Sequence, residues 1–379
     1  IIGSGGSIMA AQNFLVACDD LHRTGWAIDA QAAQPLGDGQ VRLAIASFGL
    51  SANNITYAAF GRSMRYWNFF PSGDPAWGRI PVWGFGDVIE SHVDGVTVGE
   101  RFYGYYPMSQ QLVVRPARIG AAGFVDATDC RRDLPAIYNH YSRCSADPLY
   151  RPDHEALIAL LRPLFTTSFL LADFLAEQRF FGARTAVLSS ASSKTAYGTA
   201  FGLRGNGAAR VVGLTSPANL DFTRGLGCYD EVLTYAALDT LPTHEPAVYV
   251  DFSGSRALRM AVHTHFGGAL THSAAIGATH WENLAGQGPL PGPAPSLFFA
   301  PSRAQQRSAD WGADGLRRRL AEQWGTFITA LQAAQTPWLV VTHGRGAAAV
   351  EAVYQRLVGG HLGPTEGPIL TLQPAADRA

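Results

Sequence analysis

Lys194 has the most distinctive context of any charged residue in this chain. It is the only lysine among 29 lysine and arginine residues, and it follows the apolar stretch 185–188 within the hydroxyl-rich run 189–198. An ammonium is a compact point charge, whereas the guanidinium of arginine is a wide planar fork. A turn from a strand into a helix binds phosphate well, because free N–H groups and the helix dipole meet there. The run therefore predicts a phosphate-binding turn, with a chance lysine at an exposed helix start as the alternative.

The same run offers side-chain hydroxyl groups to a diphosphate. They belong to Ser190, Ser192, Ser193 and Thr195. The G-x-G-x-x-G pattern, in which glycines let the backbone approach a pyrophosphate, is absent, and only Gly198 remains of it. A Walker P-loop requires glycines where Leu188 and Ser193 stand, so we reject that motif. Whether so glycine-poor a turn still binds a dinucleotide is left open by the sequence.

A second polar cluster follows the next expected strand, 210–214. It contains Thr215, Ser216 and Asn219, and no carboxylate. A carboxylate at this position binds the ribose hydroxyls of NAD, whereas its absence accommodates a 2′-phosphate. The sequence therefore favours NADP(H) over NAD(H). The alternative is that Ser216-Pro217 only begins a helix.

Alternating strands and helices must position both clusters. Strands rich in Val, Leu and Ile, separated by helical stretches, predict a parallel, doubly wound sheet of the Rossmann type. Ligands bind such sheets at the carboxyl ends of the strands, where both clusters fall. The expected strands are 185–189, 210–214, 230–234, 247–251, 272–276 and 296–299, and the expected helices are 195–203, 219–226 and 255–266.

The residues before this pattern predict a second, partly open β-barrel domain. Short β-rich segments bounded by Gly and Pro are typical of such barrels. The segment 117–153 is polar and irregular, and we expect it to be a functional insertion or lid. The C-terminal residues resume the style of the first domain, which suggests that the chain returns to it. The expected barrel strands are 41–48, 80–88 and 101–114, and the expected C-terminal elements are a helix at 314–332, a strand at 338–341, a helix at 347–357 and a strand at 368–372.

Length and composition exclude several classes of protein. The 379 residues suggest two domains, and 47% apolar with 16% charged residues indicates a globular chain. A net charge of −1 gives no electrostatic footprint for nucleic acid, and apolar runs such as 164–175 are too short to cross a bilayer. Four dispersed cysteines indicate a reducing cytoplasm. Residues 1–8 are expected to be an expression linker ahead of Met9.

Several segments together resemble the medium-chain dehydrogenase/reductases. Residues 98–104 are similar to the G-D-R-V strand of that superfamily, 225–230 to its L-G-A-D turn, and 350–360 to its closing helix. The resemblance covers nearly all of 9–372 and is to the zinc-free quinone- and enoyl-reductase branch. Zinc members carry Gly-His-Glu where this chain has 83–86, Trp-Gly-Phe-Gly, and the four-cysteine lobe is absent. The residues from Asn53 through Gly198 are also similar to a bacterial family of unknown function.

The resemblance implies a GroES-like catalytic domain over 9–154 and 334–379, and a Rossmann-like nucleotide-binding domain over 155–333. Tyr57 stands where quinone and enoyl reductases of this branch carry a tyrosine, and a phenol suits proton donation to a carbonyl. Asn54 is expected to hold the substrate or the nicotinamide amide, and Thr167 to face the cofactor. The resemblance further implies an enzyme without metal and a homodimer.

These expectations combine into an NADPH-dependent oxidoreductase that reduces an activated C=C bond or a quinone without metal. An aromatic-lined slot near Tyr57 would fit an apolar or aromatic small molecule, with ordinary core packing of each residue as the alternative. Its candidate residues are Tyr66, Trp67, Phe69, Phe70, Trp77, Trp83, Tyr138 and Tyr141. The alternative is a non-redox protein on the same scaffold, either a lyase-like enzyme or a small-molecule-binding protein, which the missing glycines favour. His263 and His265 are two residues apart on an expected helix, so they point apart and do not form a metal pair.

Overall fold

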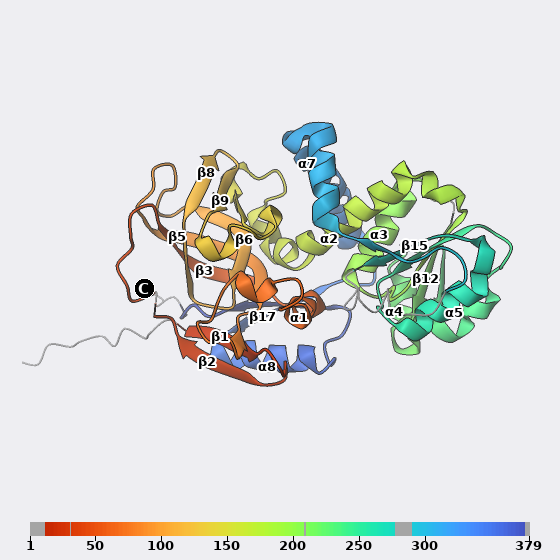
Figure 1. Cartoon of the computed structure of the whole chain (residues 1–379), viewed down its shortest axis with the longest axis horizontal. Helices are drawn as coiled ribbons and strands as arrows, with labels where there is room; N and C mark the ends of the chain where they lie inside the picture. The colour runs from red at the N-terminus through yellow and green to blue at the C-terminus, as the bar shows by residue number, and fades with distance from the viewer. Residues whose placement is uncertain (1–11, 31, 208–209, 277–289, 376–379) are drawn as a thin grey trace, which may run out of the picture. The chain divides into compact units, whose positions relative to one another are not determined.

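A computed structural model of the chain describes residues 12–30, 32–207, 210–276 and 290–375 (Figure 1). The chain divides into two compact units. Unit 1 comprises Ile1–Leu160, Val341–Leu362 and Glu366–Ala379, and unit 2 comprises Leu161–Val340 and Gly363–Thr365. Each unit is described by itself.

Unit 2 contains a parallel sheet in which every described strand runs in the same direction. The strand order is β13-β12-β11-β14-β15-β16, so the chain builds outward in one direction from β11 and then crosses over to build in the other. This is the doubly wound order, whose ligand crevice lies beside the first strand. The strands are β11 Thr185–Leu188, β12 Arg210–Thr215, β13 Glu231–Thr234, β14 Ala247–Asp251, β15 Leu270–Ile276 and β16 Ser296–Phe298. The predicted parallel sheet is confirmed.

Helices in unit 2 pack closely because small residues lie at their contacts. A Cβ built on Gly198 would lie 2.8 Å from Ser168 Oγ, and one on Gly202 would lie 2.9 Å from the Ala172 Cβ. Gly198 therefore lets α3 approach α2, which is a packing role and not a phosphate-binding one. The helices are α2 Glu155–Glu177, α3 Lys194–Gly205, α4 Leu220–Gly225, α5 Arg256–Phe266 and α7 Ala300–Ala333.

Buried ion pairs join α2 to α7. Arg303 and Arg307 both bond Asp173 Oδ2 at 2.6 Å, and both also pair with Glu177. The two arginines are 5% and 7% exposed, so these charges are shielded from water. α7 itself is interrupted at Gly312, whose φ of 73° is in the left-handed region that glycine adopts readily.

The helix over residues 152–177 is long and apolar enough to cross a membrane, contrary to the expectation that no apolar run was long enough. However, 56% of its most apolar 18-residue stretch is buried inside the protein. Asp173 within it is neutralised by two buried arginines. These features are those of a core helix, in which a charge is retained because it is paired.

Unit 1 is built mainly from antiparallel strands. Its larger sheet has the order β17-β18-β3-β5-β6-β10-β9-β8, with β7 also paired to β3, and its smaller sheet has the order β2-β1-β4. Among the described residues, two helices lie wholly within this unit, α1 Ala52–Ala59 and α8 Ala347–Val358. The strands are β1 Gln12–Ala17, β2 Thr24–Ile28, β3 Val41–Gly49, β4 Trp77–Gly78, β5 Pro81–Ser91, β6 Arg101–Pro107, β7 Gln111–Val114, β8 Pro116–Gly120, β9 Gly123–Asp126, β10 His140–Arg143, β17 Val340–Arg345 and β18 Glu366–Thr371.

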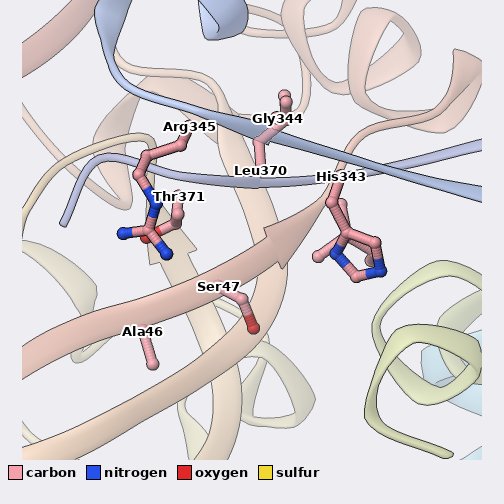
Figure 2. A pocket seen from close by; sticks show the side chains of 8 residues that line it. Ala46, Ser47, His343, Gly344, Arg345, Leu370 and Thr371 are labelled. Atoms are coloured by element: carbon pink, nitrogen blue, oxygen red, sulfur yellow. The ribbon is translucent and has the colours of Figure 1, made fainter. Parts of the chain in front are cut away.

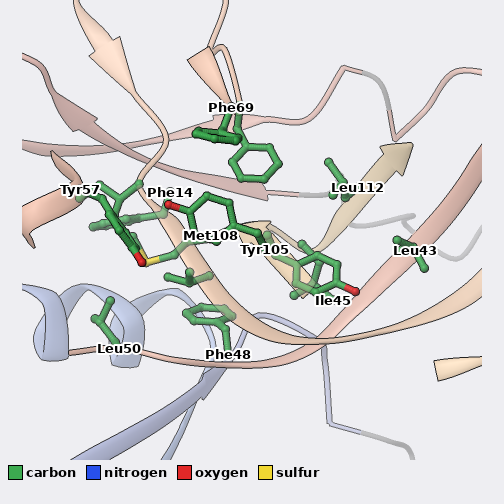
Figure 3. Close-up of a cluster of buried hydrophobic side chains, with 14 of the residues drawn as sticks. Phe14, Leu43, Ile45, Phe48, Leu50, Tyr57, Phe69, Tyr105, Met108 and Leu112 are labelled. Carbon is green, nitrogen blue, oxygen red and sulfur yellow. The ribbon is translucent and has the colours of Figure 1, made fainter. Parts of the chain in front are cut away.

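The core of unit 1 is aromatic as well as aliphatic. Figure 3 shows Tyr57, Tyr105 and Phe69 beside aliphatic side chains of β3 such as Ile45. Aromatic side chains bury large areas, which suits a barrel whose strands are short. Short 3-10 turns complete both units, at Tyr66–Asn68, Asp129–Arg131, Ala136–Tyr138, Cys144–Ala146, Pro152–His154, Arg179–Gly182, Pro217–Asn219, Tyr235–Thr240 and Gly267–Ala269.

The prediction that 117–153 is an irregular insertion or lid is wrong. β8 and β9 form an antiparallel pair, and β10 pairs with both β9 and β6, so the segment supplies three strands of the larger sheet. These strands have only four or five residues each, too few for an alternating pattern to be recognised. Charged residues in this segment also suggested an exposed loop, but Arg131 is 3% exposed and pairs with the buried Asp126.

Candidate active site

The turn from β11 into α3 is fixed by its own backbone. Ala191 N donates to Leu214 O at 3.0 Å, and Ala191 O accepts a hydrogen bond from the Tyr229 hydroxyl at 2.8 Å. Ser193 N donates to Ser190 O at 2.8 Å. Two of the amides that a glycine-rich turn would offer to phosphate are therefore used within the protein. Hydroxyl groups and the first amides of α3 are the donors that the turn still offers.

Ser190 adopts an unusual backbone conformation at this turn. Its φ of 47° is in the left-handed region, where a side chain costs about 1–2 kcal/mol. Such strain is tolerated where the surrounding structure enforces it, and it occurs often at functional sites. Glycine adopts this conformation without strain, whereas here it is adopted by serine. The Ser190 hydroxyl lies 3.5 Å from the Tyr235 hydroxyl.

Two of the predicted clusters meet at the ends of β11 and β12. Asn219 Nδ2 donates to Ser192 Oγ at 3.1 Å, which joins the first turn to the second. Ser193 caps α3 by accepting from Ala196 N at 3.3 Å. Thr215 is 1% exposed, and its hydroxyl has no hydrogen-bond partner among the residues that the structure describes. A buried unpaired hydroxyl is costly, which makes it a candidate ligand contact.

Ser216 and Thr195 contribute through their backbones. Ser216 O accepts from Asn219 N at 3.1 Å, and the Ser216 hydroxyl makes no capping bond to the turn that follows. Thr195 O accepts from both Ser168 Oγ and Thr199 Oγ1 at 2.8 Å. The Ser216 and Thr195 side chains are only partly buried, which leaves them within reach of a ligand.

Lys194 makes a contact that the sequence did not indicate. Its ammonium donates to Pro364 O at 2.9 Å, and both residues belong to unit 2. The ammonium therefore ties the short segment Gly363–Thr365 to the first turn of α3. A flexible stem with a compact head can reach a single carbonyl, for which a planar guanidinium is poorly shaped.

The Thr167 hydroxyl bonds within its own helix and not to either of these clusters. Its hydroxyl donates to Pro163 O at 3.3 Å within α2, and Thr166 bonds Arg162 O in the same manner. The residue of α2 that reaches α3 is Ser168, whose hydroxyl bonds Thr195 O. The role of Thr167 toward a cofactor stays a prediction.

A buried polar network at the ends of β11 and β14 was missed by the sequence reasoning. Asp251 accepts hydrogen bonds from Ser189 Oγ at 3.0 Å, Ser253 Oγ at 2.7 Å and Arg259 Nε at 2.9 Å. Ser189, Asp251 and Arg259 are 0%, 1% and 4% exposed. Because β11 and β14 flank the point where strand order reverses, this network sets the position of the crevice. In the sequence, the sign of this network was Asp251, an aspartate at the end of an apolar strand.

Tyr57 lies on α1 within the aromatic cluster of unit 1. Its hydroxyl accepts a hydrogen bond from Trp83 Nε1 at 3.2 Å, and its ring packs against Tyr66 and Tyr105 with centroids 4.7 and 5.5 Å apart. Burial raises the pKa of Tyr57, the nearby Tyr66 raises it further, and hydrogen bonding from Trp83 opposes this. The phenol is therefore a neutral donor at any physiological pH.

Asn54 is used mainly to position α1. Its Oδ1 accepts from Ser51 N at 2.8 Å, and its Nδ2 donates to Pro81 O at 2.9 Å. The first bond forms half of a capping box at the start of α1. At 3% exposure Asn54 is buried, and its part in chemistry stays a prediction.

The Trp83–Gly86 segment of β5 has a packing reason. A Cβ on Gly84 would lie 2.1 Å from Ser47 O, so only glycine lets β5 approach β3 this closely.

His263 bonds Ser273 Oγ and Pro291 O, whereas His265 bonds Leu241 O, as expected for residues that point apart. Among the described residues there is no group of three or more His, Cys, Asp or Glu side chains that could hold a metal. His280 and Trp281, which follow the expected strand 272–276, lie outside the described residues.

Solved structures share this fold over most of their length. The structure of CurA from Vibrio vulnificus in complex with NADPH matches with a TM-score of 0.58 at 13% identity, and the match covers 96% of this chain and 100% of CurA. The yhdH oxidoreductase from Salmonella enterica in complex with NADP gives 0.54 at 12% identity, and the CurK enoyl reductase gives 0.55 at 13%, both with the same coverage. The predicted fold, a GroES-like partly open barrel with a Rossmann-type sheet, is confirmed, as is its likeness to medium-chain reductases.

Sequence comparison gives the family directly. No curated protein matches the chain. A family model described as a protein of unknown function, DUF2855, matches residues 48–363, which is most of both units. The chain belongs to this DUF2855 family.

Proposed function

We propose that this protein is an NADPH-dependent oxidoreductase that reduces an activated C=C bond of an enone or enoyl compound, or a quinone, without a metal. The observation that carries the proposal is the pair of strand ends in unit 2. Hydroxyl groups line both ends, they are joined by the Ser192–Asn219 bond, and residues 213–219 at the end of β12 contain no carboxylate. The similarity to structures solved with NADPH and NADP supports the same reading.

The hydroxyl groups of unit 2 would hold the cofactor. Ser190, Ser192, Ser193 and Thr195 surround the start of α3, where the helix dipole also favours a diphosphate. Thr215, Ser216 and Asn219 lie at the next strand end and would bind the 2′-phosphate side of NADPH. The unpaired Thr215 hydroxyl fits this role, because a ligand oxygen would satisfy it. When bound, NADPH supplies the hydride.

Lys194 would act beside this site by holding Pro364 in place. The ammonium also adds positive charge at the start of α3, which favours a bound diphosphate electrostatically. The contribution of Lys194 is therefore both structural and electrostatic. The Lys194→Arg variant is expected to lose the hydrogen bond to Pro364 O while it keeps the positive charge.

Tyr57 would donate a proton or a hydrogen bond to the substrate carbonyl. Its raised pKa keeps the proton on the phenol, and Trp83 donates to its oxygen, so the phenol would still carry a proton to donate. The rings of Tyr66, Tyr105 and Tyr138 form an apolar, aromatic surrounding. We propose a flat, apolar or aromatic small molecule as the substrate, in a cytoplasmic enzyme that forms a homodimer.

The cofactor proposal is tested by titrating the protein with NADPH and with NADH while tryptophan fluorescence is recorded. We expect saturable NADPH binding and weaker NADH binding. Thr215→Val removes the unpaired hydroxyl with little change in volume, so it should weaken NADPH binding about tenfold without lowering the stability of the free protein. Thr329→Val on α7 is the control. Absence of NADPH binding at millimolar concentration would refute the proposal.

The proton-donor proposal is tested with Tyr57→Phe. Turnover of an enone or quinone should fall about 10²-fold or more, whereas NADPH affinity should not change. Tyr66→Phe removes a hydroxyl that bonds Tyr138 in the same cluster and is the matched control. Full activity in Tyr57→Phe would remove this residue from the mechanism.

A second candidate function is a non-redox enzyme or small-molecule-binding protein. The specific observation in its favour is that Lys194 and two turn amides are bonded within the protein. This candidate predicts that neither NADPH nor NADH binds, so the same titration separates the two.

A further inference from the structure

Unit 1 contains a cavity that none of the predicted site residues line. Its volume is about 240 Å³, and it lies beside strands β17, β18 and β3 (Figure 2). Ligand pockets for drug-sized molecules measure about 300–1,000 Å³, so this cavity suits only a small molecule. At about 30 Å³ per water molecule it has room for about eight waters. Its lining residues are Ala46, Ser47, His343, Gly344, Arg345, Ile369, Leu370 and Thr371.

The strand register explains why polar side chains meet there. His343 and Arg345 are two residues apart on β17, so their side chains leave the same face of the strand. β18 lies between β17 and β3 in the sheet, and its pairing of Leu370 with Phe48 brings Thr371 opposite Ser47. Figure 2 shows Arg345 and His343 reaching from β17 toward the side on which Ser47 lies.

Arg345 is held in position but keeps donors for a ligand. Its Nη1 donates to Gln373 O at 2.8 Å and to Pro374 O at 2.7 Å. A guanidinium carries five N–H groups, so the three on Nε and Nη2 are left over. Within the described part of the chain those three have no acceptor.

The rest of the lining combines polar and apolar residues and contains no acid. The His343 and Arg345 side chains are exposed to solvent and Ser47 is half-buried. Ala46, Ile369 and Leu370 provide apolar wall. A positioned guanidinium, an imidazole and a hydroxyl match an oxyanion, and the apolar wall matches a short hydrocarbon.

We propose that this cavity is a binding site for a small organic carboxylate. The carboxylate would be held by Arg345 and His343, with a hydrogen bond from Ser47, and a hydrocarbon body of a few carbons would pack against Ile369 and Leu370. The site is separate from the Tyr57 cluster and from the hydroxyl groups of unit 2, so it does not depend on the proposed reductase function.

The test is ligand-observed NMR with the full chain and three probes: butanoate, 1-butanol and inorganic phosphate. Butanoate should bind at millimolar concentration, 1-butanol should not, and phosphate should bind more weakly than butanoate. Arg345→Gln should weaken butanoate binding about tenfold or more. Arg318→Gln, which alters an exposed arginine of α7, should have no effect.

Because Arg345 also holds the C-terminal residues, a second variant guards against a folding defect. Ser47→Val removes a hydroxyl that has no described partner and fills part of the cavity with a larger side chain, so it should abolish butanoate binding without lowering the melting temperature. The proposal is overturned if butanoate does not bind, if 1-butanol or phosphate binds as tightly, or if Ser47→Val and Arg345→Gln bind butanoate like the unchanged protein.

Discussion

Buried charge is retained in unit 2 only where it is fully bonded. Asp251 illustrates this, because its two oxygens accept from Arg259, from Ser189 and Ser253 hydroxyls and from two backbone amides. A carboxylate transferred from water to this environment would be strongly penalised without these donors. The network holds the ends of β11 and β14 together, and through Ser189 it supports the turn where we place the cofactor.

We expect Asp251→Leu to lower the free energy of unfolding by about 3–5 kcal/mol, because it leaves the Arg259 guanidinium buried without a counter-charge. Urea denaturation followed by circular dichroism measures this. The double variant Asp251→Leu with Arg259→Met should recover part of the loss. Asp314→Ala removes the partner of exposed Arg317 and should cost less than about 1 kcal/mol. A loss below that value in Asp251→Leu would contradict the argument.

Two histidines of unit 2 predict a fall in stability at acidic pH. Burial lowers the pKa of His263 and of His272 below the ordinary value. Neutral His263 accepts from Ser273 while it bonds Pro291, and the His272 ring stacks on Phe181 at 3.9 Å. The unfolded chain binds these protons near pH 6.5, before the folded protein does. Stability is therefore complete above about pH 6.5 and is lost as the pH falls through the lowered folded values.

The measurement is the urea midpoint between pH 8 and pH 5.5. His272→Phe keeps a ring on Phe181 and removes one titrating group, so its midpoint should depend less on pH. His22→Gln changes an exposed histidine and should leave the slope as it is. An identical slope in His272→Phe would show that other groups cause the pH dependence.

At the scale of elements, close contacts between strands predict which glycines of unit 1 cannot be substituted without loss of stability. Gly84→Ala would bring a Cβ to within 2.1 Å of Ser47 O and 2.8 Å of the Phe48 Cα, both of which belong to the backbone of β3. The strands would have to separate, at a cost of at least about 3 kcal/mol. Gly120→Ala on β8 meets nothing within 4 Å and should change stability by less than about 0.5 kcal/mol. Thermal melting of both variants checks this, and equal melting temperatures would refute it.

The sequence predicted the elements of unit 2 well, because the strands of a parallel sheet are buried on both faces. β11, β12 and β14 are continuous apolar runs followed by hydroxyl groups or an acid, which is a strong local signal. β8 to β10 were missed, since short strands with charged residues have no clear period.

The candidate site was predicted in its residue types but not in its bonding. The pattern of hydroxyls indicated that Ser192 and Asn219 lie at neighbouring strand ends, and the structure joins them. Nothing local indicated that Lys194 reaches Pro364, 170 residues further along the chain. Asn54 was selected for its amide, yet that amide is bonded to Ser51 and Pro81. Long-range contacts of this kind are set by tertiary packing, which a single sequence does not display.

At the scale of the whole molecule, the described residues of each unit include a hydrophobic cluster of their own. One is the aromatic and aliphatic cluster of unit 1, and the other packs around the parallel sheet of unit 2. Units with cores of their own are expected to unfold as separate cooperative transitions. α2 crosses the division at Leu160 and Leu161, so it is the one helix whose melting affects both units.

We therefore expect differential scanning calorimetry to show two transitions. Asp173→Ala leaves Arg303 and Arg307 with Glu177 as their shared α2 partner, costs about 3 kcal/mol and lowers one transition by roughly 6–12 °C. Gly84→Ala should lower the other. NADPH at a hundred times its dissociation constant adds about 2.7 kcal/mol to the unit that binds it. If the cofactor site is in unit 2, NADPH raises the transition that Asp173→Ala lowers. A single transition, displaced alike by both variants, would show that the two cores unfold together, and an NADPH effect on the Gly84→Ala transition would place the cofactor in unit 1.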